Sequence, residues 1–128
     1  MYGRAANTYR KVSVHSASPA RVLDELFLRL LRDVEEAKGA IERHDLKAKG
    51  ELIGHAMAIV AELECALDRD AAPELCDNLR SLYGFMSENL LAASLDLDAK
   101  RLDAVLTAAR PLREAFSQVA SPEPAGTP

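Results

Sequence analysis

Apolar residues recur every three or four positions along most of the chain, which is the spacing of one face of an α-helix. The first such stretch follows Ser18-Pro19, a pair typical of a helix start because serine caps free N–H groups and proline fits the first helical position. Its apolar positions are Val22, Leu23, Leu26, Phe27, Leu30, Leu31, Val34, Ala37 and Ile41. The pattern predicts an amphipathic helix that ends near the turn His44-Asp45.

Three further stretches show the same period. Asp45 is predicted to cap the second helix, Asp68–Pro73 to end it, and Asp96 or Asp98 to cap the fourth. Pro111 lies inside the fourth pattern and predicts that this helix kinks or restarts there. The apolar positions are Leu52, Ile53, Ala56, Met57, Ile59, Val60, Leu63 and Leu67 in the second stretch, Leu75, Leu79, Leu82, Tyr83, Met86 and Leu90 in the third, and Leu102, Val105, Leu106, Ala109, Leu112 and Phe116 in the fourth.

Short turns between long helices make sequential neighbours antiparallel. The sequence therefore predicts an all-α fold, an antiparallel up-down four-helix bundle over residues 18–119 with a short N-terminal cap segment over residues 1–17. Residues 120–128 are expected to form a disordered tail, because the last eight residues include three prolines and no large apolar side chain.

Composition narrows the class of protein. The chain has 128 residues, no tryptophan and few aromatic residues, so one domain with a core of leucine, valine, isoleucine and alanine is expected. The net charge is −4, and no basic stripe interleaved with aromatic residues points to nucleic acid. No apolar run approaches the roughly 18 residues that span a bilayer, and the N-terminus does not read as a secretory signal. We therefore expect a cytoplasmic protein that binds no nucleic acid and does not insert into membranes.

The residue types needed for catalysis are not arranged for it. His44 and His55 are about three helical turns apart and cannot share one metal ion. No paired Glu-x-x-His motif of a di-iron bundle occurs. We predict no catalytic residue, metal or cofactor, and no enzyme. One alternative stays open, a histidine phosphotransfer or signalling bundle that uses Gly54-His55, although the next four residues, Ala56–Ile59, supply no lysine or glycine. A structural bundle that only self-associates is a third possibility.

Several short segments occur in a distinctive order. The chain opens with Met1-Tyr2 and Tyr9, continues with Val14–Pro19, which reads VHSASP, and then with Leu26-Phe27. The later segments are Glu35–Lys38, Asn78-Leu79, Leu82-Tyr83, Leu90–Ala93 and Leu112–Phe116. Together, over about residues 1–119, they resemble the FliS family of flagellar export chaperones. The resemblance implies a protein that binds the C-terminal segment of flagellin in the cytoplasm, prevents its premature polymerisation and delivers it to the flagellar export apparatus. It also implies the absence of a cofactor, and a homodimer, since family members are often dimeric.

Apolar residues extend beyond the stripe that a bundle core needs. Leu46, Ile53 and Met57 lie on one flank of the second helix, and Phe85 and Leu91 lie outside the central stripe of the third. Such excess width can form a groove for a partner helix. Tyr2 and Tyr9 belong to a segment that is expected to shield such a groove until the partner displaces it. The predicted partner-binding residues are Tyr2, Tyr9, Ile53, Met57, Val60, Tyr83, Met86 and Leu90.

Overall fold

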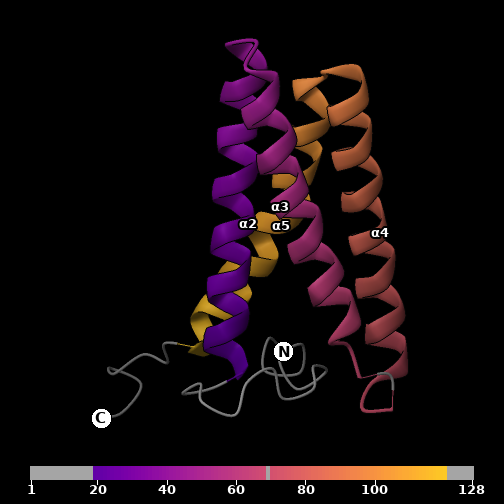
Figure 1. Cartoon of the computed structure of the whole chain (residues 1–128). Helices are drawn as coiled ribbons and strands as arrows, with labels where there is room; N and C mark the ends of the chain where they lie inside the picture. The colour runs from indigo at the N-terminus through magenta and orange to yellow at the C-terminus, as the bar shows by residue number, and fades with distance from the viewer. Residues whose placement is uncertain (1–18, 69, 121–128) are drawn as a thin grey trace.

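The computed structural model describes residues 19–68 and 70–120, and every regular element in these ranges is a helix. The helices are α2 (Pro19–Glu42), α3 (Leu46–Cys65), α4 (Pro73–Asp96) and α5 (Ala99–Ala120) (Figure 1). The all-α prediction is confirmed. The N-terminal cap segment, the Ser18 cap and the tail after Ala120 fall outside the described residues, so the predicted division into segments stays a prediction.

The four helices form a closed ring in which each packs against two others. α2 packs against α3 and α5, and α4 packs against α3 and α5. Ion pairs across the α2–α5 seam join Lys38 to Asp103 at 2.6 Å and Asp24 to Arg113 at 3.0 Å. Because residue numbers rise along α2 while their partners' numbers fall along α5, the two helices are antiparallel. The predicted up-down bundle is confirmed.

Local chemistry sets the turns between the helices. Asp45 caps α3 as predicted, since its side chain accepts a hydrogen bond from the Ala48 N–H at 3.1 Å. At the last turn Asp98, not Asp96, takes the capping place: its carboxylate accepts from the Lys100 N–H at 3.0 Å, while Asp96 is the last residue of α4. Leu97 between them has the left-handed φ of 54° that reverses the chain.

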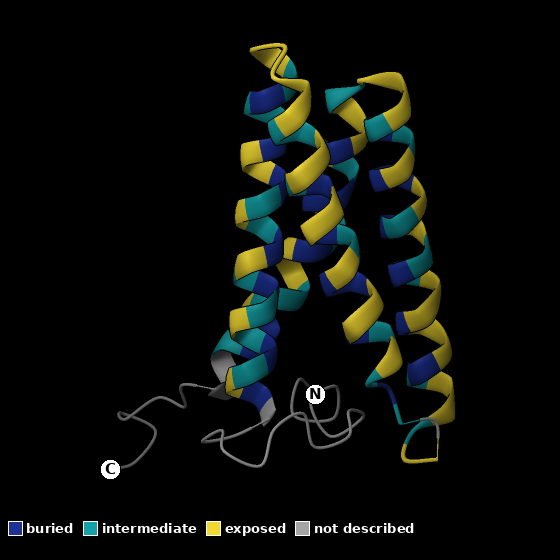
Figure 2. Cartoon of the chain, in the orientation of Figure 1, coloured by how far each residue is buried: buried dark blue, intermediate teal, exposed yellow. Residues whose placement is uncertain are grey.

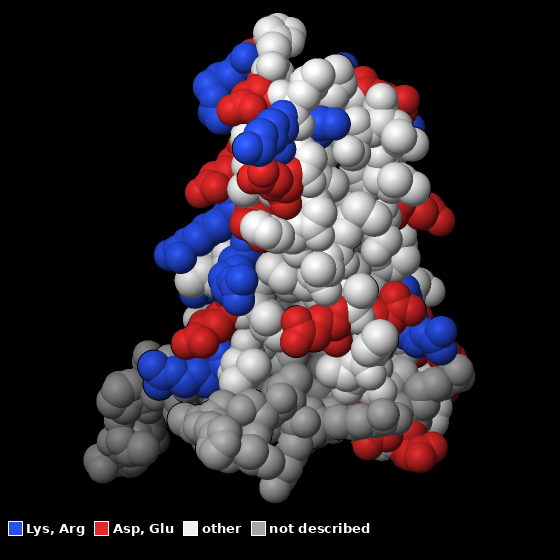
Figure 3. Space-filling view, viewed as in Figure 1, with Lys and Arg blue, Asp and Glu red and all other residues white. Residues whose placement is uncertain are grey.

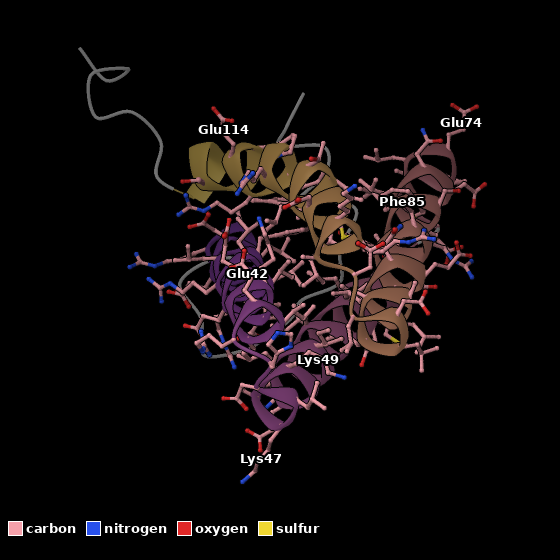
Figure 4. All side chains as sticks on the ribbon, turned by 90° about the horizontal axis from the view of Figure 1, so that it is seen from above. Glu42, Lys47, Lys49, Glu74, Phe85 and Glu114 are labelled. Atoms are coloured by element: carbon pink, nitrogen blue, oxygen red, sulfur yellow. The ribbon has the colours of Figure 1, made fainter. Side chains whose placement is uncertain are left out.

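α5 runs as one helix through Pro111. The restart predicted as one possibility at this proline is therefore wrong. The kink, the other possibility, agrees with Figures 1 and 4, which show α5 changing direction towards its C-terminal half. Proline lacks an N–H and crowds the preceding turn, which accounts for a bend without ending the helix. The last part of α5 still brings the buried side chain of Phe116 into the core.

The core runs along the centre of the bundle, where the inward face of every helix is buried (Figure 2). Phe27 of α2 lies at its aromatic centre: its ring stacks on Phe116 with centroids 5.4 Å apart and lies tilted to Tyr83 at 6.4 Å. The largest fully buried side chains are Tyr83, Phe27, Phe116, Leu23, Leu30, Leu63, Met86, Leu90, Leu102, Leu106, Val34 and Val60.

Candidate partner-binding site

Most of the predicted groove residues lie in the core of the free chain. Met57 is only half-buried and packs on the edge of the core. The other described members of the predicted set are buried, namely Ile53, Val60, Tyr83, Met86 and Leu90. Tyr2 and Tyr9 fall outside the described residues. The structure therefore places one predicted residue, Met57, at an accessible surface, and partner contact by the whole set stays a prediction.

Tyr83 is a predicted partner-binding residue that the free chain buries. Its amphipathic side chain is of a kind that suits an interface. In the structure its exposed fraction is 0 %, and its ring lies against Phe27. Packing of α4 against other helices, among them α2 through Phe27, buries this side chain completely, which a helical wheel of α4 alone cannot show.

The exposed apolar side chains of α3 and α4 point to a surface beside these core residues. Leu91 and Leu95, on successive turns of α4, are 50 % and 74 % exposed, and Leu46 at the start of α3 is 57 % exposed. Two contacts show where these helices meet: the Lys49 Nζ donates to the Ser94 carbonyl at 3.0 Å, and Glu64 pairs with Arg80 at 3.7 Å. Helical spacing from these contacts places the outward stripes of both helices on one surface. We call it the α3–α4 face; it comprises Leu46, Gly50, Gly54, Met57, Ala61, Gly84, Ser87, Leu91 and Leu95.

None of the residues that make up this face is ionisable, and the exposed Glu88, between Gly84 and Leu91 on α4, borders it on the solvent side. Lys49 bounds it at one end, where Figure 4 shows its side chain directed towards α4, and the Glu64–Arg80 pair bounds it at the other. Figure 3 shows the same contrast over the molecule: a broad uncharged area lies over α3 and α4, whereas acidic and basic side chains cover the α2 side. An uncharged strip of this kind on a charged protein is typical of an interaction surface.

Glycine residues leave space on the α3–α4 face between its longer apolar side chains. A Cβ added to Gly50, Gly54 or Gly84 would meet no other atom within 4 Å. Gly50 and Gly54 are exposed and Gly84 is half-buried, and close packing within the chain does not require glycine at any of the three positions. Their helices bear the cost of glycine in a helix interior, about 0.5–1 kcal/mol each relative to alanine. In return, the absence of side chains at these positions leaves space on the outer surface of α3 and α4.

Phe85 is exposed on a different side of α4. Its exposed fraction is 45 %. Asn89, one turn later, donates to the Phe85 carbonyl at 2.8 Å and accepts from Arg101 of α5 at 3.5 Å. Phe85 therefore lies on the α5 side of α4, away from the α3–α4 face, and offers a matched control for it.

The α2 side of the bundle is built from charged groups. Besides the pairs across the α2–α5 seam described above, Glu35 binds Arg110 at 2.6 Å. A hydrogen bond to Asp103 raises the pKa of Lys38 above its ordinary value. Burial raises the pKa of Asp33, which the positive charges of His55 and Arg29 oppose only in part. The ion pairs hold α2 against α5, and charged side chains cover much of the α2 side of the bundle (Figure 3).

Neither a metal centre nor a membrane span is found among residues 19–68 and 70–120. No three histidine, cysteine or acidic side chains in these ranges are grouped to hold an ion. None of the four helices combines the length and the apolar character that crossing a bilayer requires. His55 is exposed and lies beside Glu51 and Glu36 at a surface cavity. Carboxylates at this position disfavour the approach of a phosphoryl group to the imidazole.

Comparison with known proteins agrees with the resemblance seen in the sequence. The family model described as "Flagellar protein FliS" matches residues 2–123. The chain belongs to the FliS family. It is 36 % identical over 106 residues to the flagellar secretion chaperone FliSB of Pseudomonas aeruginosa, covering 80 % of this chain and 84 % of the relative. It is 33 % identical over 116 residues to the flagellar secretion chaperone FliS of Salmonella typhimurium, covering 87 % and 86 %, and 30 % identical over 115 residues to that of Vibrio cholerae, covering 87 % and 85 %.

The match to the FliS family spans all four helices, so it applies to the α3–α4 face as well as to the core. In this FliS family member, sequence reasoning found Leu46, Met57 and Leu91 as excess apolar positions but missed Leu95 and the glycines between them. A usable signal was present: the residues at spacings of three and four around Met57 carry no charge, and around Leu91 only Glu88 does. What the sequence lacked was the contact between α3 and α4 that joins two short stripes into one surface.

Proposed function

We propose that this FliS family protein is a cytoplasmic flagellar export chaperone that binds the C-terminal segment of flagellin, prevents its premature polymerisation and delivers it to the export apparatus. The observation that carries the proposal is the exposed, uncharged α3–α4 face on a chain of this family. The relatives' names support the class of function, since they are flagellar secretion chaperones.

The chemistry of the face suits an amphipathic helix. Flagellin's terminal segments assemble as helices within the filament, so a chaperone must cover their apolar sides reversibly. Partner side chains spaced at i, i+3 and i+4 would lie between Leu46 and Met57 on one side and Leu91 and Leu95 on the other. Gly50 and Gly54 would let the partner backbone approach α3 closely. Met57 has a flexible, polarizable side chain that adapts to different partners.

The predicted residues below the surface have a supporting place in this proposal. Ile53 and Val60 lie beneath the α3 part of the face, and Met86 and Leu90 beneath the α4 part, as expected from their helical spacing to Met57 and Leu91. They would contact flagellin directly only where the two helices separate. Tyr2 and Tyr9 are proposed to act through the N-terminal segment, which competes with flagellin for apolar surface.

A pair of alanine substitutions tests the binding surface. Leu63 is fully buried, so Leu63→Ala should cost about 2–5 kcal/mol of unfolding free energy. Met57 is half-buried, so Met57→Ala should change stability by less than about 1 kcal/mol yet weaken flagellin binding by about 1–2 kcal/mol. Thermal melts and isothermal titration with the flagellin C-terminal segment measure both quantities. Unchanged affinity for Met57→Ala would move the groove elsewhere on the bundle.

A charge introduced on each side of α4 gives a sharper control. Leu95→Glu places a carboxylate on the α3–α4 face and should weaken flagellin binding by about ten-fold or more. Phe85→Glu makes the equivalent change on the α5 side of the same helix and should leave the affinity unchanged. Equal affinities of the two variants for flagellin would contradict the proposed surface. Complete absence of flagellin binding by the unaltered protein would contradict the proposed function itself.

The alternative role as a phosphotransfer bundle depends on His55. Purified protein treated with acetyl phosphate or a cognate kinase should acquire no acid-labile phosphate, and His55→Ala should leave flagellin binding intact. Acid-labile phosphate that disappears in His55→Ala would favour the alternative.

A further inference from the structure

A second surface lies on the opposite flank of α3, where α2 and α3 border an open cavity of about 580 Å³. This volume is in the range of pockets that hold a small ligand or a large side chain. Ala48 and Leu52 of α3 and Gly39 of α2 supply apolar lining. The charged lining residues are Glu35, Glu36 and Arg43 of α2 and Glu51 of α3, with His55 beside them.

The carboxylates of this cavity are unequal. Glu35 is already engaged, because its Oε1 accepts from Arg110 of α5 at 2.6 Å. Glu36 and Glu51 are exposed and form no ion pair with any residue in the described ranges. The negative charge of Glu36 also contributes to the raised pKa of Asp33 on the same helix. Two uncommitted carboxylates, one from each helix, therefore border an apolar cavity.

The cavity already tolerates a guanidinium group at one edge. The Arg43 side chain folds back over its own helix, so that its Nη1 lies 3.0 Å from the position a Cβ would take on Gly39. Because Gly39 has no side chain, the guanidinium of Arg43 can lie next to this position. A flat guanidinium can thus lie against the α2 wall, while the carboxylates of Glu36 and Glu51 remain available to another cation.

We propose that the α2–α3 cavity, bordered by Glu36 and Glu51 and lined by Leu52, binds an arginine side chain of a protein partner. The aliphatic stem of arginine would cover Leu52 and Ala48, and its guanidinium would donate to the two carboxylates. Arginine fits better than lysine because its planar fork can serve acceptors from both helices at once. Arg43 opposes this binding through like-charge repulsion and sets an upper limit to its strength.

The position of the cavity makes it independent of the flagellin proposal. Glu51 and His55 lie on the α2 flank of α3, whereas Gly50, Gly54 and Met57 lie on its α4 flank and outer side. One helix thus presents two different surfaces, an uncharged one and an acidic one. A partner held through the cavity would leave the α3–α4 face accessible, so the bundle could hold two proteins at the same time.

The test is a titration of the full ¹⁵N-labelled chain with the peptide acetyl-Ala-Arg-Ala-amide, followed by amide chemical shifts. The isosteric peptide with citrulline in place of arginine serves as the uncharged control. Saturable shifts should centre on Gly39, Ala48, Leu52 and His55 with the arginine peptide and be absent with the citrulline peptide. Shifts of equal size with both peptides, or no saturable shift with either, would overturn the proposal.

Variants of matched charge separate a specific site from general attraction. Glu36→Gln with Glu51→Gln should weaken the arginine peptide by about five-fold, whereas Arg43→Gln should strengthen it. The control removes the same charge elsewhere, by Glu74→Gln with Glu114→Gln on α4 and α5, whose side chains Figure 4 shows directed away from the bundle. Equal weakening by the two double variants would refute the site. Flagellin binding should be the same in all these variants. The arginine-site proposal and the flagellin proposal can therefore be refuted independently of each other.

Discussion

Replacing Phe27 by alanine should remove the aromatic centre of the bundle. Phe27 has no exposed surface, and its ring contacts Phe116 of α5 and Tyr83 of α4. Truncating a fully buried phenylalanine costs about 3–5 kcal/mol, because transfer free energy is lost and a cavity remains. A single domain has only about 5–15 kcal/mol of stability in total. We therefore expect Phe27→Ala to remain folded at low temperature but to melt roughly 10–20 °C lower.

The same substitution at Phe85 is the internal comparison. Phe85 is 45 % exposed, so Phe85→Ala should cost about 1 kcal/mol or less. Urea unfolding followed by far-ultraviolet circular dichroism gives both free energies, and the slopes should match if each variant keeps the native compactness. Similar losses for the two variants would refute the assignment of core and surface.

A double-mutant cycle isolates the aromatic contact from simple burial. The stacking of Phe27 on Phe116 should appear as a coupling of about 0.5–1.5 kcal/mol when both are replaced by leucine, singly and together. Leucine keeps most of the buried volume, so these variants stay measurable even if Phe27→Ala fails to fold. Additive losses would show that the two rings contribute only buried area.

Three further outcomes follow from the charged seam and the open glycines. A hydrogen bond to Asp103 raises the pKa of Lys38 above its ordinary 10.5, so the stabilising contribution of Lys38 is complete below that pH and is lost as the pH rises through the folded-state pKa. Urea titrations at alkaline pH should therefore show a shrinking difference in unfolding free energy between the native chain and Lys38→Met. Asp33 has a pKa raised above 3.8, chiefly by burial, so its ionisation opposes folding at neutral pH; Asp33→Asn should be the more stable form at pH 7, and the difference should vanish below the ordinary value. Gly54→Ala should raise the unfolding free energy by about 0.5–1 kcal/mol, since the added methyl group meets no atom; a loss on thermal melting would contradict this.

Local signals in the sequence determined where the helices begin and end. Asp45 and Pro73 act through hydrogen bonds or backbone angles within a few residues of themselves, so their effect can be read without knowing the fold. The apolar period of 3.6 likewise marks which side of each helix turns inward. Short turns between long helices then leave the up-down bundle as the natural arrangement.

Only the tertiary structure decided which apolar residues are core and which are surface. Tyr83 and Phe85 stand two positions apart on α4, yet the first is fully buried and the second is 45 % exposed. Leu91 and Leu46 belong to different helices and form one uncharged face because the Lys49–Ser94 contact brings α3 and α4 together at that end. A helical period gives the direction of a side chain relative to its own axis. Its burial depends on neighbouring helices whose distance, register and tilt come from packing among residues far apart in the sequence.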